Sequence, residues 1–159
     1  MLAILSSCGS EKATTYTFDK NEYEENLEKY VNIKGEMDAF SCDMTGLLFN
    51  EKFINAAKSL LKSGKSDDQI GLAIFELFGE LSDDDPYLSI KVTESEVEWI
   101  ALSEKSKIES NKFSFPIKLE KDKETLSFTI IEKTEELLIL NTKLEDDTDC
   151  NYPFKSIKI

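Results

Sequence analysis

The spacing of apolar residues changes along the chain and separates a helical region from extended ones. Between residues 50 and 79, apolar positions recur every three or four residues, which is typical of amphipathic helices. From Tyr87 onward, apolar and polar residues alternate in short runs separated by polar turns, which predicts the strands of an antiparallel meander. The chain therefore combines a central helical region with a C-terminal sheet.

Two helices are predicted in the middle of the chain. Asn50 is placed to cap the first helix, which ends at Gly64. Ser66 and Gln69 have the spacing of a capping box for the second helix, and Gly79 ends it. The short connection makes the pair an αα-hairpin. We expect its aromatic side chains to pack against the sheet, with display to a partner as the alternative. These side chains are Phe53, Phe75 and Phe78.

Strands are predicted before and after the hairpin. The first is expected over residues 31–39, where apolar and polar residues alternate, after a short helix over residues 20–29. Pro116 has no N–H to donate to a neighbouring strand, so its strand is expected at an edge or with a bulge. The later strands are expected over residues 88–92, 97–101, 113–119, 126–130, 137–140 and 154–159.

This order of elements predicts an α+β fold. It is an antiparallel meander sheet or a partly closed up-and-down β-barrel, with the αα-hairpin inserted after the first strand. The architecture resembles that of bacterial lipocalin-like lipoproteins, in which helices partly close an up-and-down barrel. The two forms differ in function, because a barrel can hold a small apolar ligand whereas an open sheet offers a surface.

The charge composition excludes several kinds of chemistry. The 159-residue chain has 32 acidic and 19 basic residues, a formal net charge of −13 and no histidine, and all its basic residues are lysine. Histidine-based nucleophilic catalysis, histidine-ligated zinc or haem, and bidentate arginine recognition are therefore unavailable. We expect no cofactor and no enzymatic activity; catalysis would need a site of lysine, carboxylate or tyrosine groups. Nucleic acid is excluded as a partner because its phosphates repel an acidic chain.

The start of the chain carries a motif that suggests its location. Leu5-Ser6-Ser7-Cys8 follows an apolar run and resembles the lipobox of bacterial lipoproteins. The resemblance implies acylation of Cys8, cleavage just before it, and anchoring to a membrane by more than one acyl chain. It divides the chain into a truncated signal peptide (residues 1–7), a lipid-anchored tether (8–15) and a single globular domain (16–159). The alternative is a cytosolic protein whose apolar N-terminus arose by chance.

Acylation of Cys8 leaves two further cysteines, Cys42 and Cys150. An exported protein is expected to oxidise such a pair, so we predict a disulfide between them. Two unpaired thiols are the alternative. The bridge closes a loop of about a hundred residues, which contributes up to ~4–5 kcal/mol in the chain-entropy model.

Two groups of side chains are candidates for ligand binding. Four aromatic residues of the predicted strands are candidates to line an apolar cavity, although an ordinary core uses the same residue types. They are Trp99, Phe113, Phe115 and Phe128. Two acidic clusters are weak candidates for calcium, and solvated loops are the preferred interpretation because neither cluster has EF-hand spacing. Their residues are Asp83, Asp84, Asp85, Asp146, Asp147 and Asp149.

Together these features predict a membrane-anchored bacterial lipoprotein of the cell envelope, at the outer membrane, in the periplasm or on the cell surface. We expect a non-enzymatic binding module for a small apolar ligand or a protein partner. The alternative function is an acidic inhibitor or immunity-type lipoprotein, whose charge complements a basic toxin or hydrolase.

Overall fold

An antiparallel sheet of eight strands is the centre of the fold. The computed structural model describes residues 12–32, 38–82, 84–117, 126–144 and 147–157. Within these residues the strands are β1 (Thr14–Phe18), β2 (Ser89–Val92), β3 (Glu96–Trp99), β4 (Glu104–Lys107), β5 (Lys112–Ser114), β6 (Ser127–Lys133), β7 (Leu137–Lys143) and β8 (Asp149–Ser156).

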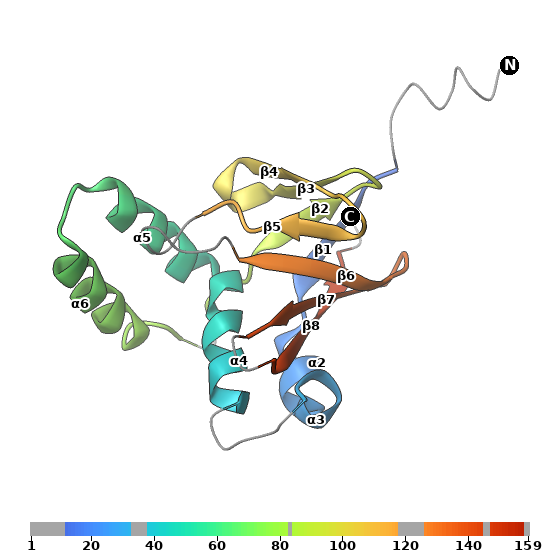
Figure 1. Cartoon of the computed structure of the whole chain (residues 1–159), viewed down its shortest axis with the longest axis horizontal. Coiled ribbons are helices and arrows are strands. Elements are labelled where there is room, and N and C mark those ends of the chain that lie inside the picture. Colours follow the sequence, from blue (N-terminus) through green and yellow to red (C-terminus); the bar gives the residue numbers. More distant parts are fainter. Residues whose placement is uncertain (1–11, 33–37, 83, 118–125, 145–146, 158–159) are drawn as a thin grey trace, which may run out of the picture.

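The strand order closes the sheet almost completely. The strands are hydrogen-bonded in the order β4-β3-β2-β1-β8-β7-β6-β5, and all the pairs are antiparallel. β1 lies between β2 and β8, so the first strand of the chain joins the two meandering halves. The sheet curves until its two end strands approach each other (Figure 1). This arrangement confirms the α+β class and its barrel form.

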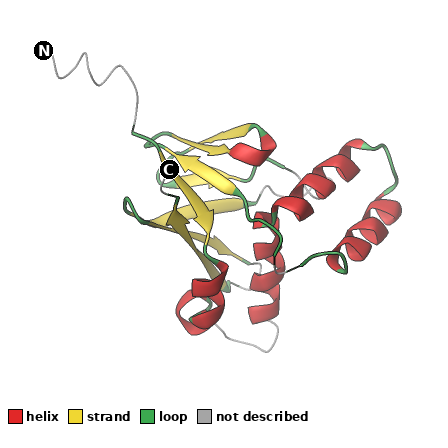
Figure 2. Cartoon of the chain, turned by 180° about the vertical axis from the view of Figure 1, so that it is seen from behind, coloured by secondary structure: helices red, strands yellow, loops and turns green. Residues whose placement is uncertain are grey.

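The main helices form an insertion between β1 and β2. Helices α2, α3 and α4 cover one end of the barrel, whereas α5 and α6 project to its side as an αα-hairpin (Figures 1 and 2). Short 3-10 turns precede α5 and follow β3. The bounds are α2 (Lys20–Glu25), α3 (Leu27–Tyr30), α4 (Asp38–Gly46), η1 (Leu47–Phe49), α5 (Glu51–Lys62), α6 (Asp67–Phe78) and η2 (Ile100–Leu102).

The hairpin helices begin where their capping residues predicted. The side chain of Asn50 accepts a hydrogen bond from the Phe53 amide at 2.9 Å. Ser66 and Gln69 form both hydrogen bonds of a capping box, at 3.0 and 3.3 Å. These contacts satisfy amide groups that a helix N-terminus leaves without intrahelical partners. The predicted αα-hairpin is therefore confirmed, and its local signals account for it.

The first strand lies earlier in the chain than the sequence analysis predicted. β1 begins at Thr14, inside the segment that was assigned to the tether. The strand expected over residues 31–39 is wrong at its described ends, because Val31 makes a single bridge and Ala39 lies in α4. Residues 33–37 lie outside the described part. Threonine and aromatic residues suit a half-buried strand, and β1 alternates these two types, which a polar tether does not.

One of the two end strands of the sheet differs from the sequence prediction. β4 was not predicted, because its sequence Glu104–Lys107 is polar throughout and lacks an alternating apolar face. β5 is the opposite end strand, and it stops at Ser114 before Pro116. The expectation that Pro116 marks an edge is therefore confirmed, because a residue without an N–H cannot continue the ladder.

The ring of Tyr152, on β8, is at the centre of the core. It contacts the rings of Phe18, Tyr23, Phe49 and Phe128, with centroid separations between 5.1 and 6.5 Å. All five side chains are buried. Three of these ring pairs are edge-on and the pair with Tyr23 is stacked, and both arrangements add to the stabilisation that burial gives. β8 therefore links the two halves of the barrel to the helices at its end.

The predicted disulfide joins Cys42 of α4 to Cys150 of β8. The two Cα atoms are 5.5 Å apart, and both side chains are fully buried. Beside it the Tyr152 hydroxyl donates a hydrogen bond to the Cys42 carbonyl at 2.7 Å. Gly46 leaves room for the Tyr152 ring, because a Cβ at that position would meet the ring at 3.3 Å. These contacts fix α4 on the barrel.

Replacing both Cys42 and Cys150 with serine is expected to lower the free energy of unfolding by about 4 kcal/mol, because the bridge spans 108 residues of sequence. Urea denaturation followed by the fluorescence of Trp99 measures this change. Dithiothreitol should destabilise the wild-type protein by a similar amount and leave the double variant unchanged. Equal sensitivity of the two proteins to dithiothreitol would contradict the prediction.

Candidate functional site

The four aromatic candidates for a ligand cavity lie together inside the barrel. The ring of Trp99 is 5.1 Å from that of Phe115 and 5.9 Å from that of Phe113, and Phe113 is 5.9 Å from Phe128. All four side chains are buried. Each ring therefore contacts another ring, as in a packed core. A ligand cavity among them stays a prediction, and a ligand would enter only if these rings moved apart.

Ser106 connects the two end strands of the sheet near these rings. The Trp99 indole Nε1–H donates to Ser106 Oγ at 3.1 Å, and Ser106 Oγ donates to the Ser114 carbonyl oxygen at 2.9 Å. Ser106 lies on β4 and Ser114 on β5. A side-chain hydrogen bond therefore bridges the strands where the barrel closes, and it also satisfies the buried indole.

The described members of the two acidic clusters do not gather into a metal site. Asp85 Oδ2 accepts a hydrogen bond from the Ser82 amide at 2.8 Å, and Asp84 is exposed. Asp149 Oδ1 accepts from Asn141 at 3.3 Å. Among the residues that the structure describes, no three carboxylate, cysteine or histidine groups are placed to hold a metal ion.

The other three members of the acidic clusters are Asp83, Asp146 and Asp147. Asp147 is exposed and has a positive φ of 64°. Asp83 and Asp146 lie outside the described residues. Solvated loops therefore stay the preferred interpretation of both clusters, and calcium binding stays the weaker alternative.

A polar pocket of about 490 Å³ lies between α3 and β8. It opens on the outside of the barrel, near the end that the helices cover. Carboxylate, amide and ammonium groups dominate its wall, so it suits a polar molecule and not a fatty one. Of its lining residues the sequence analysis singled out Asp149 alone. The lining residues are Glu28, Lys29, Val31, Asn32, Asp149 and Asn151.

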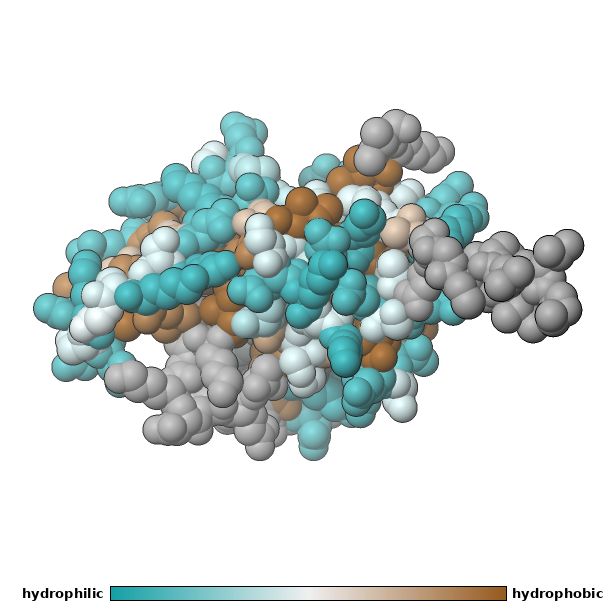
Figure 3. Space-filling view, turned by 90° about the horizontal axis from the view of Figure 1, so that it is seen from above, coloured by the Kyte–Doolittle hydropathy of each residue, from teal (hydrophilic) through white to brown (hydrophobic). Residues whose placement is uncertain are grey.

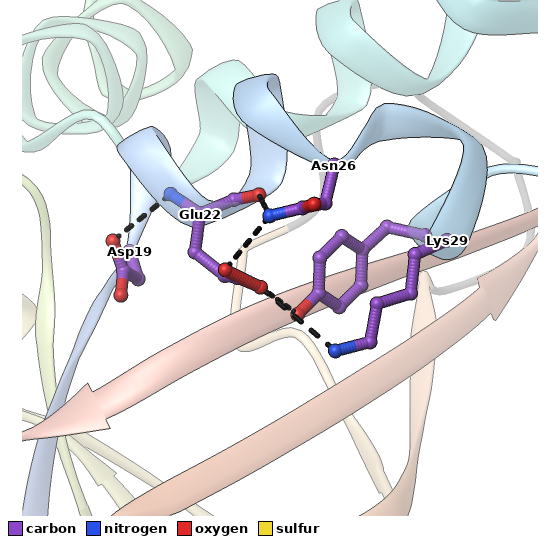
Figure 4. A network of polar contacts seen from close by, with 5 residues as sticks. Asp19, Glu22, Asn26 and Lys29 are labelled. Atoms are coloured by element: carbon purple, nitrogen blue, oxygen red, sulfur yellow. Dashed lines mark hydrogen bonds and ion pairs between the residues drawn. The ribbon is translucent and has the colours of Figure 1, made fainter.

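A network of polar contacts centred on Glu22 holds α2 and α3 beside this pocket (Figure 4). The Glu22 amide donates to Asp19 Oδ1 at 3.2 Å, which caps α2. Glu22 Oε1 accepts from Asn26 at 2.9 Å, and Oε2 accepts from the Tyr30 hydroxyl at 2.6 Å. Lys29 Nζ lies 3.9 Å from Oε2. The carboxylate of Glu22 is thus shared by three side chains, and its role is to connect two short helices.

The tyrosines at this end of the barrel are donors and not bases. Burial and the hydrogen bond to Glu22 raise the pKa of Tyr30. Burial and the nearby charge of Asp43 raise the pKa of Tyr23, whose hydroxyl lies 3.0 Å from Asp43 Oδ1. A tyrosine hydroxyl is protonated at neutral pH in any case, and the raised pKa keeps these two protonated at alkaline pH as well. The two groups therefore donate hydrogen bonds that hold the helices in place.

Helix α5 fastens the hairpin to the barrel. Phe53 and Ile54 are buried beneath it, and Lys58 Nζ donates to the Leu102 carbonyl at 2.9 Å. Phe53 also stacks on Phe78 of α6, with ring centroids 5.4 Å apart and planes 11° from parallel. The inner helix thus contacts both the barrel and the outer helix.

Helix α6 exposes apolar side chains on the face turned away from α5. Phe75 is 72% exposed and Leu72 is 61% exposed, whereas Leu77 is buried. Figure 3 shows apolar surface among polar atoms at this end of the molecule. The expectation that Phe53, Phe75 and Phe78 all pack toward the sheet is therefore wrong for Phe75. The outer helix meets α5 on one side, so its opposite face has no cover among the described residues.

A sequence signal for this surface was available. Over residues 70–78 the only charged residue is Glu76, so apolar residues face every direction around the helix. A helix that is apolar all round is normally buried all round. The pattern indicates that α6 contacts something on both sides, but it does not say what covers the second side.

The proposed lipidation residue, Cys8, lies outside the described residues, as do the predicted signal peptide and most of the tether. None of the helices in the described part has the length and apolar character needed to cross a membrane. Attachment through Cys8 stays a prediction.

Comparison with known proteins gives no relative. No family model, no curated protein and no solved structure matches the chain.

The Ser106→Ala variant is expected to lose about 1–3 kcal/mol of stability, because the buried indole N–H of Trp99 loses its acceptor. Ser114→Ala is the matched control, since it keeps the backbone carbonyl that accepts from Ser106. Urea denaturation and the emission maximum of Trp99 measure the effect. Equal losses in the two variants would argue against a bridge through Ser106.

Proposed function

We propose that this protein is a lipid-anchored lipoprotein of the bacterial cell envelope that acts as a non-enzymatic binding module for a protein partner. The barrel is a rigid scaffold, and the αα-hairpin presents the binding surface. The observation that carries the proposal is the exposed apolar face of α6.

Two features support a location outside the cytoplasm. The buried disulfide between Cys42 and Cys150 is typical of an oxidising compartment, because cytosolic thiols are kept reduced. The lipobox-like Leu5-Ser6-Ser7-Cys8 offers an acylation site a few residues before β1 begins. The two features are independent, since one depends on the fold and the other on the N-terminal sequence alone.

The packed interior supports a surface partner over a small apolar ligand. The rings of Trp99, Phe113, Phe115 and Phe128 contact one another and are buried. A lipid-sized guest would displace these contacts, whose burial contributes about 1.5–3 kcal/mol for each side chain. A partner on α6 displaces only water. The balance therefore favours recognition on the outside of the fold.

The position of the hairpin also suits an anchored binding protein. β1 begins, and β8 ends, on the side of the barrel away from α5 and α6, and the two views agree on this (Figures 1 and 2). A tether that runs from Cys8 into β1 would therefore attach the protein by the end opposite the hairpin. The exposed face of α6 would then point away from the membrane.

The second candidate function is an acidic inhibitor or immunity-type lipoprotein. The observation that favours it is the net charge of −13, which attracts basic proteins and speeds their association. Inhibition of a basic lysozyme that weakens as salt is added would support it. Binding without inhibition would support the more general role.

Anchoring is expected to depend on Cys8. In cells, a version with a full signal sequence upstream should take up labelled palmitate and fractionate with membranes. The Cys8→Ala variant should do neither, because its side chain has no thiol to acylate. Cys42→Ala is the matched control for loss of a cysteine, and it should keep the label. Labelling that is lost in neither variant, or in both, would contradict the lipobox prediction.

A further inference from the structure

We propose that the outer face of α6 docks a cationic amphipathic segment of a partner protein. The contact pairs Leu72 and Phe75 with apolar side chains of that segment, and the acidic residues around them with its lysine or arginine residues. This inference rests on the proposed role as a protein-binding module, and it names the surface and the chemistry of the partner.

Leu72 and Phe75 form one continuous apolar surface. They lie three residues apart on α6, a spacing that makes their side chains neighbours on a helix. The other large apolar side chains that are exposed in the described residues lie singly on separate parts of the fold, and single exposures of this kind are ordinary. They are Phe40, Ile100, Ile131 and Ile157.

The neighbouring helix shows what a solvated face looks like in this protein. α5 buries Phe53, Ile54 and Ala57 and turns polar residues to solvent. These exposed residues are Lys52, Asn55, Ser59 and Lys62. α6 instead turns its second- and third-turn apolar residues to solvent. The hairpin therefore has one ordinary helix and one whose outer face has the composition of an interface.

The charges around this face select a basic partner. The segment from residue 67 to residue 85 contains aspartate and glutamate but no lysine. Asp68 lies one turn before Leu72, and Glu76 lies one turn after it, and both are exposed. A partner that brought carboxylates to this surface would be repelled, whereas lysine or arginine beside an apolar anchor would be attracted at both ends of the contact.

The same charges disfavour a second copy of this chain as the occupant. Two α6 faces brought together would place Asp68 and Glu76 of one copy against the acidic face of the other. The net charge of −13 on each chain adds a long-range repulsion. A different, basic protein meets neither penalty.

The surface of α6 is already ordered before a partner binds. The capping box of Ser66 and Gln69 and the stack of Phe53 on Phe78 fix α6, so few backbone conformations are lost when a partner docks. Aromatic side chains that a partner desolvates are common anchors of protein interfaces, so Phe75 is the expected anchor and Leu72 extends the apolar contact beside it.

The test uses a fluorescein-labelled synthetic peptide as the probe, built from leucine and lysine in a helical repeat, and the full 159-residue chain. A second peptide with glutamate at every lysine position keeps the apolar pattern and reverses the charge. Fluorescence anisotropy measures the dissociation constant. We expect the lysine peptide to bind, with an affinity that falls as salt is added, and the glutamate peptide not to bind.

Matched variants locate the site. Phe75→Ala and Leu72→Ala should each weaken binding of the lysine peptide by about tenfold, whereas Ile131→Ala, at a comparably exposed position on β6, should not. The pair Asp68→Asn and Glu76→Gln should weaken binding and reduce its salt dependence. Glu94→Gln with Glu109→Gln is the charge control, because these residues are also exposed but lie outside α6. Urea denaturation verifies that each variant is folded.

The outcomes separate this inference from the proposed function. Binding that no α6 variant weakens would overturn the docking site and leave a binding module that uses another surface. No binding of the lysine peptide would also overturn the docking site, while the Cys8→Ala experiment judges the envelope location by itself. Sedimentation velocity of the protein alone adds one more outcome. A dimer that Phe75→Ala abolishes would replace the basic partner with a second copy of the chain.

Discussion

The sheet, the end helices and the disulfide all meet at Tyr152. Its ring contacts residues of β1, α2, η1 and β6, its hydroxyl bonds to the carbonyl of Cys42, and Cys150 lies two residues before it on the same strand. Because elements from both ends of the chain contact this ring, it packs the barrel and the helices at its end together. The position of α4, and with it the start of the hairpin, follows from that arrangement.

The sequence predicted the parts of the fold whose causes are local. The caps at Asn50 and Ser66 placed α5 and α6, and the alternation after Tyr87 placed most of the later strands. The failures have non-local causes. α4 is held by a disulfide and by the Tyr152 hydroxyl, not by an apolar stripe of its own, and the polar strand β4 exists because β3 beside it offers a ladder. Local propensity does not contain these interactions.

The candidate sites also separate into those that local sequence patterns predicted and those that depend on non-local contacts. The pairing of Cys42 with Cys150 followed from counting cysteines, and the clustering of Trp99 with three phenylalanines followed from strand alternation. The exposure of Phe75 was not predicted, although the run from residue 70 to residue 78, with Glu76 as its only charged residue, was a signal for it. Periodicity shows which residues of a helix are apolar, but it does not show how many sides the rest of the chain covers. The polar pocket beside α3 was not predicted for a related reason, since its walls come from segments far apart in the sequence.

The pairing of β1 with β2 makes the helices between them an insertion into the sheet. These strands pair directly, Thr17 opposite Ser89, so the sheet needs only a tight turn between them. Everything from residue 19 to residue 88 is an elaboration of that one connection. Sequence in the outer helix can therefore diverge rapidly without disturbing the strand register, much as loops vary on a fixed immunoglobulin framework. The scaffold is suited to carry grafted recognition elements in place of α6, provided that the junction at Asn50 and Tyr87 is kept.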